Sequence, residues 1–460
     1  MRIKPAISAF LLLLTFSSLP ESAGASSRLE RPSYWINRLS APEKVILTDA
    51  GIAELNRLII GRTDQMAEMR EFPDAVSGET LLWWLLHDPV LSPENGLDIR
   101  FKEDGGEIKN DFFASLADNM NLPGIMDINP VIFGVVIGRA DIRAFPADEP
   151  VFKRPGGKES DTFQYSAVYP PEPAALLHLS KDLRWGFFQT SSVRGWIRLD
   201  KVAFAGRKDA VRSGAFIVVT GSMVNVYKDR GTKKVLGRVP MGTVLHLTDG
   251  KKPGGSLFRG GPLAIMFPVN SGGALQWVTG YLRPGEDVKR GFLPYTAGNA
   301  IKEAFKMLGE GYGWGGKGGG RDCSAFIKDV FATMGIMLPR NSARQAFAGD
   351  VLAEADTARA NDILTSALEA ARPGITLLAL DGHIMLYIGT AGGHPYVIHQ
   401  IAGYMDGDRF VSLYKTSVTR LEAGDGVNRR RFRDRLKSVT EVVLPAGSKT
   451  APERGAQPVE

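Results

Sequence analysis

The sequence predicts an α+β protein, and three successive stretches of the chain support this fold class. Residues 26 to about 130 carry apolar residues at helical spacing, residues 131–287 form short alternating strands, and the last third sets an apolar helix before two alternating strands. Hydrophobic residues make up 44% and charged residues 23% of the 460, as in globular chains with an ample core. This length favours several domains, since one domain takes roughly 100–200 residues.

The first residues are typical of an export signal. Arg2 and Lys4 precede an apolar run over residues 6–16, and the small residues at 23–25 offer a cleavage site. The run is too short to span a bilayer comfortably, and no cysteine follows it for lipid attachment. We therefore expect a signal peptide over residues 1–25, a periplasmic or secreted location, and no stable membrane insertion after the signal is removed.

Residues 26–130 are expected to form a helical packing domain. Thr48 or Asp49 can cap a helix that carries Ile52 and Leu55 at helical spacing. No group of residues with reaction chemistry stands out in this range. We therefore expect it to support the rest of the chain.

Two small β-barrels are expected next, over residues 131–208 and 209–287. Short strands recur between Gly, Pro and Asp, and the second half repeats the first more weakly. This paired pattern resembles tandem bacterial SH3-like domains, which commonly accompany cell-wall enzymes. Trp185 and Trp196 fall on apolar strands and are expected in the barrel core, the alternative being a platform for a ligand.

Cys323 is the only cysteine in the chain. A glycine-rich run at 315–320 leads into Asp322-Cys323-Ser324, and an apolar helical stripe follows at positions 326, 327, 330, 331 and 334. A thiol in the first helical turn lies among unpaired N–H groups and the positive end of the helix dipole, which favour the thiolate. An unpaired thiol in an exported protein indicates catalysis, and the alternative is a lone buried cysteine acting as a small hydrophobe.

Two histidines downstream offer a base for this thiol. His383 opens one alternating strand and His399 lies in the next, across a glycine-rich loop. A hairpin centred near Gly392 places Met385 opposite His399, whereas one centred near Ala391 places His383 opposite it; in either register both imidazoles share one side. Two unrelated strand histidines are the alternative. The three residues could formally bind zinc, but CxxC, HxxxH and HExxH spacings are absent, so we expect no metal.

These residues together resemble the NlpC/p60 family of cysteine peptidases. The resemblance rests on Tyr312-Gly-Trp-Gly-Gly316, on Asp322-Cys323-Ser324, on Gly382-His383 opening a strand, and on His399 in the next. It implies a papain-like catalytic domain over residues 295–445, preceded by the two SH3-like barrels and an N-terminal stabilising segment, as in multidomain members of the family. Residues 446–460 lack hydrophobic periodicity and are expected to be a disordered tail.

The resemblance also implies roles for single residues. Cys323 matches the nucleophile, His383 the base and His399 the residue that orients the base. Tyr312 matches an aromatic residue that helps stabilise the oxyanion, although its interval to the cysteine is one residue shorter than usual. Asp322 and Ser324 match positions that recognise the free amino end of a stem peptide, and a plain helix N-cap is the alternative for Asp322.

The expected function is hydrolysis of γ-D-glutamyl-diamino acid bonds in murein stem peptides or muropeptides, without a cofactor. The formal charge of +6 suits an acidic polymer, but no dense Lys/Arg run is interleaved with aromatic residues, so we expect no nucleic-acid partner. Two alternatives stay open: a wall-binding protein whose peptidase domain is inactive, and an amidase or acyltransferase on the same scaffold. The sequence does not indicate an oligomeric state.

Overall fold

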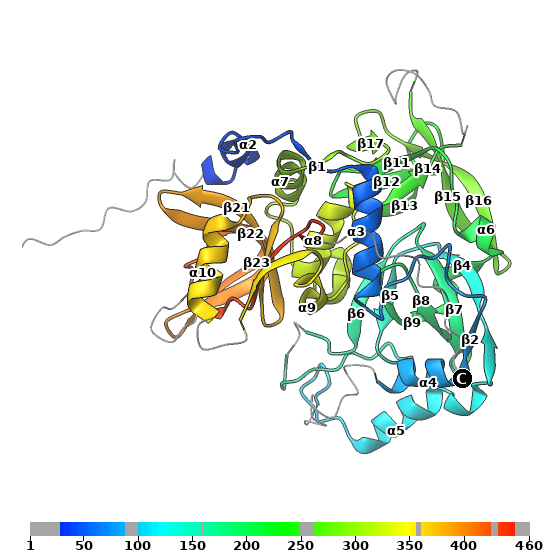
Figure 1. Ribbon diagram of the computed structural model, residues 1–460. Coiled ribbons are helices and arrows are strands. Elements are labelled where there is room, and N and C mark those ends of the chain that lie inside the picture. The colour runs from blue at the N-terminus through cyan, green and yellow to red at the C-terminus, as the bar shows by residue number, and fades with distance from the viewer. Residues whose placement is uncertain are drawn as a thin grey trace, which may run out of the picture.

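A computed structural model describes residues 28–87, 100–157, 160–248, 261–355, 360–424 and 431–446. The predicted signal peptide, and the predicted tail after its first residue, lie outside the described residues. Helices and strands both contribute to the described chain, so the predicted α+β class is confirmed (Figure 1).

The N-terminal segment is divided between two hydrophobic cores. Trp35 is 1% exposed, and its ring lies 5.2 Å from that of Tyr396 in the C-terminal domain. Helices α4 (Gly78–Leu86) and α5 (Asn110–Asn119) instead pack with the first barrel, for example through Leu85 of α4 and Leu116 of α5. The elements of this segment are α2 (Pro32–Ile36), β1 (Val45–Leu47), α3 (Asp49–Gly61), β2 (Ala75–Ser77), α4 (Gly78–Leu86), α5 (Asn110–Asn119) and β3 (Ile128–Pro130).

Helix α3 begins where the sequence predicts. The Thr48 side chain accepts a hydrogen bond from the Gly51 N–H at 3.3 Å, so Thr48 is the N-cap. On its other side the Asn56 amide donates to the Gly335 carbonyl at 2.9 Å and accepts from the Met337 N–H at 2.8 Å. The helix is thereby joined to the loop that follows the cysteine-bearing helix.

Most strands of the two barrels join in one hydrogen-bonded sheet, while β11, β14 and β17 form a separate sheet of three described strands. The link is a short parallel pairing between β10 and β16, with Phe204 opposite Ala274. Trp185 and Trp196 are 2% and 0% exposed, so their placement in the barrel core is confirmed. The strands are β4 (Ile132–Val136), β5 (Ala140–Arg143), β6 (Gln164–Val168), β7 (Pro173–Leu179), β8 (Trp185–Gln189), β9 (Arg194–Arg198), β10 (Val202–Phe204), β11 (Phe216–Val219), β12 (Met223–Tyr227), β13 (Val235–Pro240), β14 (Val244–His246), β15 (Leu263–Ser271), β16 (Ala274–Leu282) and β17 (Val288–Arg290).

The C-terminal domain is a sheet of six described strands in the order β19-β24-β20-β21-β22-β23. Helix α8 contributes to the core on one face of this sheet and α10 to the core on the other (Figure 1). Its elements are β18 (Tyr295–Thr296), α7 (Ala297–Phe305), α8 (Cys323–Ala332), α9 (Ser342–Gln345), β19 (Asp350–Glu354), α10 (Ala360–Ala370), β20 (Thr376–Leu380), β21 (His383–Ala391), β22 (His394–Asp406), β23 (Arg409–Arg420) and β24 (Ser438–Glu441).

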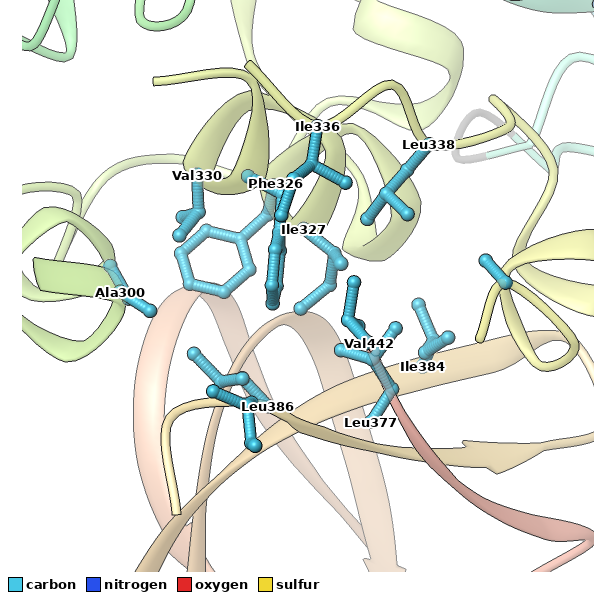
Figure 2. Packing of buried hydrophobic residues seen from close by; sticks show 14 of the residues in the cluster. Ala300, Phe326, Ile327, Val330, Ile336, Leu338, Leu377, Ile384, Leu386 and Val442 are labelled. Carbon is cyan, nitrogen blue, oxygen red and sulfur yellow. The ribbon is translucent and has the colours of Figure 1, made fainter. Parts of the chain in front are cut away.

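The apolar stripe after Cys323 is the buried face of α8. Phe326, Ile327 and Val330 are each 0% exposed, as the helical spacing predicts. Figure 2 shows these side chains facing Leu386 and Ile384 of β21. This packing fixes the start of α8 against the start of the strand that carries His383.

Two predicted helices differ from the structure. The sequence reads as a helix from Ser342 to Leu352, but α9 ends at Gln345 and β19 begins at Asp350. Pairing with β24 explains the change, because long-range strand partners override local propensity. A short helix expected from Ala300 begins earlier as α7, because Thr296 caps it by accepting from the Asn299 N–H at 3.1 Å.

Within the described ranges, no helix combines the length and the apolar character needed to cross a membrane.

Asn56→Ala should lower the free energy of unfolding by about 1–3 kcal/mol, because it removes two hydrogen bonds and leaves backbone groups of Gly335 and Met337 unpaired. Arg57→Ala, in the next and largely exposed position, should change it by less than about 0.5 kcal/mol. Urea unfolding of both variants measures the difference. Equal losses would show that the Asn56 contacts do not stabilise the fold.

Candidate active site

Cys323 is the first residue of α8, and Asp322 is the N-cap of that helix. Asp322 Oδ1 accepts from the Ala325 N–H at 2.9 Å, which is the N-cap alternative considered for this residue. Cys323 is 7% exposed, so the thiol lies just beneath the surface. The helix start therefore presents the thiol beside a backbone N–H group that has no helical partner.

The glycine-rich run before Cys323 is pressed against β6 of the first barrel. Gly315 has φ 56°, and a Cβ there would lie 2.5 Å from Cγ of Gln164. Gly316 has φ 78°, and a Cβ there would lie 2.6 Å from that of Ala167. Only glycine adopts this backbone at so close an approach without strain. The run is thus one wall of the site and also the contact between two domains.

His383 and His399 lie side by side on the sheet. Leu386 pairs with Ile398. The same register places Met385 opposite His399, so the hairpin is the one centred near Gly392. His383 Nε2 lies 2.8 Å from His399 Nδ1. His399 is fully buried, and its Nε2 lies 3.1 Å from Thr419 Oγ1. A fixed outer partner of this kind sets the ring orientation and tautomer of the second histidine.

The structure brings Cys323 to the start of β21. The N–H of Ile384, the residue after His383, is directed at the thiol and favours its charged form. Among the described residues, no hydrogen bond joins Cys323 Sγ to an imidazole nitrogen. Catalytic hydrogen bonds are often long before substrate is bound, so this spacing does not exclude proton transfer between them.

Burial decides the charge of the thiol. It raises the pKa of Cys323 from 9.0 to about 12, and the Asp322 carboxylate adds to the rise. The N–H groups of Ile384 and Ser324 and the Arg340 guanidinium lower this pKa but do not offset burial. The N–H groups at the helix start do favour the thiolate, as expected, but the loss of water around the thiol outweighs them and the resting protein holds the neutral thiol.

Burial likewise keeps the imidazoles neutral. It lowers the pKa of His383 from 6.5 to about 4, and the Arg435 cation lowers it further while Asp322 acts in the opposite direction. The pKa of His399 lies well below 6.5 because of burial and of His383. At neutral pH the resting site therefore holds a thiol and a neutral imidazole, which are the protonation states from which general-base catalysis starts.

Tyr312 lies at the same end of the sheet. Its N–H donates to the Tyr414 carbonyl at 2.9 Å, and the two rings meet edge to face at 6.2 Å between centroids. Tyr414 has φ 45°, a left-handed conformation that costs energy for a residue with a side chain. Burial, with Asp322 and Cys323, raises the pKa of Tyr312, so its hydroxyl stays protonated and able to donate to an oxyanion.

Ser324 and Asp322 are tied together by a residue that the sequence did not single out. Arg340 Nη2 donates to Asp322 Oδ2 at 2.6 Å, and its Nη1 donates to Ser324 Oγ at 2.7 Å. The sequence from Leu338 to Asn341 indicates only a break after the helix that begins at Cys323. The one local feature is a basic residue directly after Pro339, and it does not indicate which side chains the guanidinium contacts.

A metal site is the other arrangement that Cys323, His383 and His399 could form. In the part of the chain that the structure describes, no group of three or more His, Cys, Asp or Glu residues has the arrangement of a metal site. His383 Nε2 faces His399 Nδ1, which leaves neither of these nitrogens directed at a shared ion.

Comparison with known proteins agrees with this geometry. Residues 309–406 match the model of the NlpC/P60 family, and residues 150–198 match the model of the SH3 domain of SH3b1 type. The chain thus carries a segment that matches the SH3b1-type domain ahead of a segment that matches the NlpC/P60 family, and the resemblance is confirmed. The solved structure of an NlpC/P60 endopeptidase from Photobacterium damselae subsp. piscicida has a similar fold, with a TM-score of 0.66, 19% identity, and coverage of 89% of this chain and 97% of that chain.

Two curated relatives match shorter stretches. A probable endopeptidase p60 of Listeria innocua is 56% identical over 46 residues, which is 10% of this chain and 10% of that protein. A γ-D-glutamyl-L-lysine dipeptidyl-peptidase of Bacillus subtilis is 36% identical over 95 residues, 20% of this chain and 30% of that protein. The chain matches less than a third of the length of either relative.

Alkylation of Cys323 by iodoacetamide should rise with pH up to values above 9, because burial raises the pKa of this thiol from 9.0 to about 12. The chain has one cysteine, so mass spectrometry of the intact protein follows this site alone. The urea-unfolded protein is the control and should show an ordinary thiol midpoint near 8.5. A folded-state midpoint below 8 would contradict the raised pKa.

Hydrolytic activity should persist down to about pH 4, because the pKa of His383 is lowered to about 4 and the base is neutral above that value. Arg435→Gln removes a cation that disfavours protonation of His383, so the pKa rises and the acid limb of kcat/KM should move to higher pH. Arg433→Gln, two residues away, serves as the matched control. An acid limb that moves downward, or equally in both variants, would contradict this arrangement.

Proposed function

We propose that this chain, with its NlpC/P60-family domain, is an exported cysteine endopeptidase that hydrolyses γ-D-glutamyl-diamino acid bonds in murein stem peptides. Cys323 is the nucleophile, His383 the base and His399 the residue that orients it. The periplasmic or secreted location rests on the signal-like residues 1–25. The wall substrate rests on the SH3b-type domain and on the similarity to the γ-D-glutamyl-L-lysine dipeptidyl-peptidase of Bacillus subtilis.

One observation carries the assignment. His383 and His399 are joined at 2.8 Å on the sheet against which α8 packs, and α8 begins with the only cysteine of the chain. A nucleophile, a base and a third group that holds the base are the parts that covalent hydrolysis requires. A cysteine that only fills space in the core does not require a base and a second residue that orients the base.

Acylation begins from the neutral pair. His383 takes the thiol proton as Cys323 Sγ attacks the carbonyl carbon of the scissile amide. The negative charge that develops on the carbonyl oxygen is met by the Cys323 N–H and by the Tyr312 hydroxyl, which burial keeps protonated. The His383 imidazolium then gives its proton to the leaving amine, the C–N bond breaks, and a thioester remains on Cys323.

Deacylation repeats these roles with water. His383 takes a proton from water, the hydroxide adds to the thioester carbonyl, and the C–S bond breaks. The departing sulfur recovers the proton from the imidazolium, which restores the thiol. His399 holds the ring of His383 in one orientation and accepts or donates the bridging proton as that ring changes charge.

Cys323→Ala should abolish cleavage of L-Ala-γ-D-Glu-diaminopimelate by the purified protein, because the variant has no nucleophile. His399→Ala should lower kcat by about 10²-fold with a smaller effect on KM, because the base is then free to rotate. Mass spectrometry of the products identifies the bond that is cut and separates hydrolysis from acyl transfer. Normal turnover by Cys323→Ala would remove the nucleophile assignment.

His394→Ala is the matched control for His399→Ala. His394 lies on the same hairpin but is exposed and pairs at 3.7 Å with Glu422, away from the thiol. This variant should keep wild-type kcat and KM. Failure of the wild type to cut any stem peptide, with an unreactive thiol, would favour an inactive wall-binding protein instead.

A further inference from the structure

Arg340 is a buried cation between the nucleophile helix and the first barrel. It is 6% exposed, and its three guanidinium nitrogens each donate to a different side chain. Nη2 reaches Asp322 at 2.6 Å, Nη1 reaches Ser324 at 2.7 Å, and Nε reaches Ser166 of β6 at 2.8 Å. One side chain therefore joins the residues on either side of Cys323 to a residue of another domain.

Asp322 is held by a full set of donors. Oδ1 accepts from the Ala325 N–H at 2.9 Å and from the Ser324 hydroxyl at 3.2 Å. Oδ2 accepts from the Gly315 N–H at 3.0 Å as well as from Arg340. All acceptor directions of the carboxylate are thus used by the protein, and its position fixes both the first turn of α8 and the glycine-rich wall.

The first barrel holds the same wall from its other side. Gln164 Nε2 donates to the Gly315 carbonyl at 3.0 Å, and Arg139 Nη2 donates to the Gly316 carbonyl at 2.7 Å. Trp314 in turn donates its indole N–H to the Asp161 carbonyl at 2.9 Å. The barrel therefore contacts the segment before the nucleophile directly, and the residues on either side of the nucleophile through Arg340.

The choice of arginine follows from this geometry. Asp322 and Ser324 are 8% and 4% exposed, so a charge at this place needs a partner with several fixed donors. A planar guanidinium reaches three acceptors at once, whereas a lysine ammonium supplies the charge without the fork. The pair is neutral as a whole, so its main effect on turnover is the placement of the thiol, while the guanidinium by itself lowers the pKa of Cys323.

We propose that Arg340 is a positioning residue for Cys323, through which the docked first barrel sets the geometry of the nucleophile. The proposal deepens the proposed function and rests on it. It gives the first barrel a part in the chemical step, independent of any binding to the cell wall. Arg340 contacts neither substrate nor the reacting atoms in this scheme; it acts through Asp322, Ser324 and Ser166.

The test compares Arg340→Lys, Arg340→Gln and Ser166→Ala in the full chain with L-Ala-γ-D-Glu-diaminopimelate as substrate. Arg340→Lys should lower kcat by about 10- to 100-fold with KM within about threefold, because a displaced nucleophile slows the chemical step more than binding. Ser166→Ala keeps the ion pair between Arg340 and Asp322 and loses only the hydrogen bond from the Arg340 guanidinium to the barrel. It should lower kcat by about three- to tenfold, and wild-type kcat in this variant would overturn the role of the barrel.

Arg321→Lys is the matched control. Arg321 is also buried, at 7% exposure, and joins α8 to the second barrel by donating to Asp329 at 2.7 Å and to the Ser222 carbonyl at 2.6 Å. It should lower the thermal midpoint to an extent similar to Arg340→Lys while leaving kcat within about threefold. An equal loss of kcat in both variants would reduce Arg340 to a structural role and overturn the proposal.

The double variant Arg340→Gln with Asp322→Asn separates folding from placement. It removes both buried charges and keeps a side chain that can cap α8, so the thermal midpoint should recover while kcat stays low. Recovery of both the thermal midpoint and kcat would overturn the proposal.

Alkylation of Cys323 gives a readout that does not depend on turnover. The pH midpoint of alkylation should rise in Arg340→Gln and stay in place in Arg321→Lys, even if the wild type cuts no stem peptide.

Discussion

The position of α8 is the constraint on which the rest of the site depends. Its apolar face lies on the sheet of the C-terminal domain, its first turn meets the first barrel, and its last turn meets the second. There a Cβ on Gly242 would come within 2.5 Å of that of Ala332, so the second barrel approaches the helix as closely as backbone allows. Three domains therefore meet at one helix, the first barrel near its start and the second barrel near its end.

Local rules were enough to predict the elements that carry the reacting groups. The stripe of α8 follows from its 3.6-residue period, and the shared side of His383 and His399 follows from strand alternation with a tight glycine turn. These patterns need only neighbours in the sequence. For the same reason the sequence predicted the two tryptophans of the barrel core and the cap of α3.

Features that depend on distant partners could not be predicted in this way. Arg340 meets Ser166 across 174 positions, and its own surroundings carry no period that indicates a site. Strand β19 reads locally as helix and becomes a strand through β24. The charge state of Cys323 follows the same rule, since the helix start is visible in the sequence whereas the burial that opposes it arises only when the chain folds.

The order of the strands in the C-terminal sheet also makes the site depend on a late segment of the chain. β24 lies between β19 and β20 and pairs with both, although it is the last of the described strands to leave the ribosome. A chain that ends before Ser438 contains the thiol and both histidines but lacks β24, so no strand joins β19 to β20. Closure of the six-stranded sheet therefore requires a strand from the far end of this domain, although Cys323 and both histidines come before it in the chain.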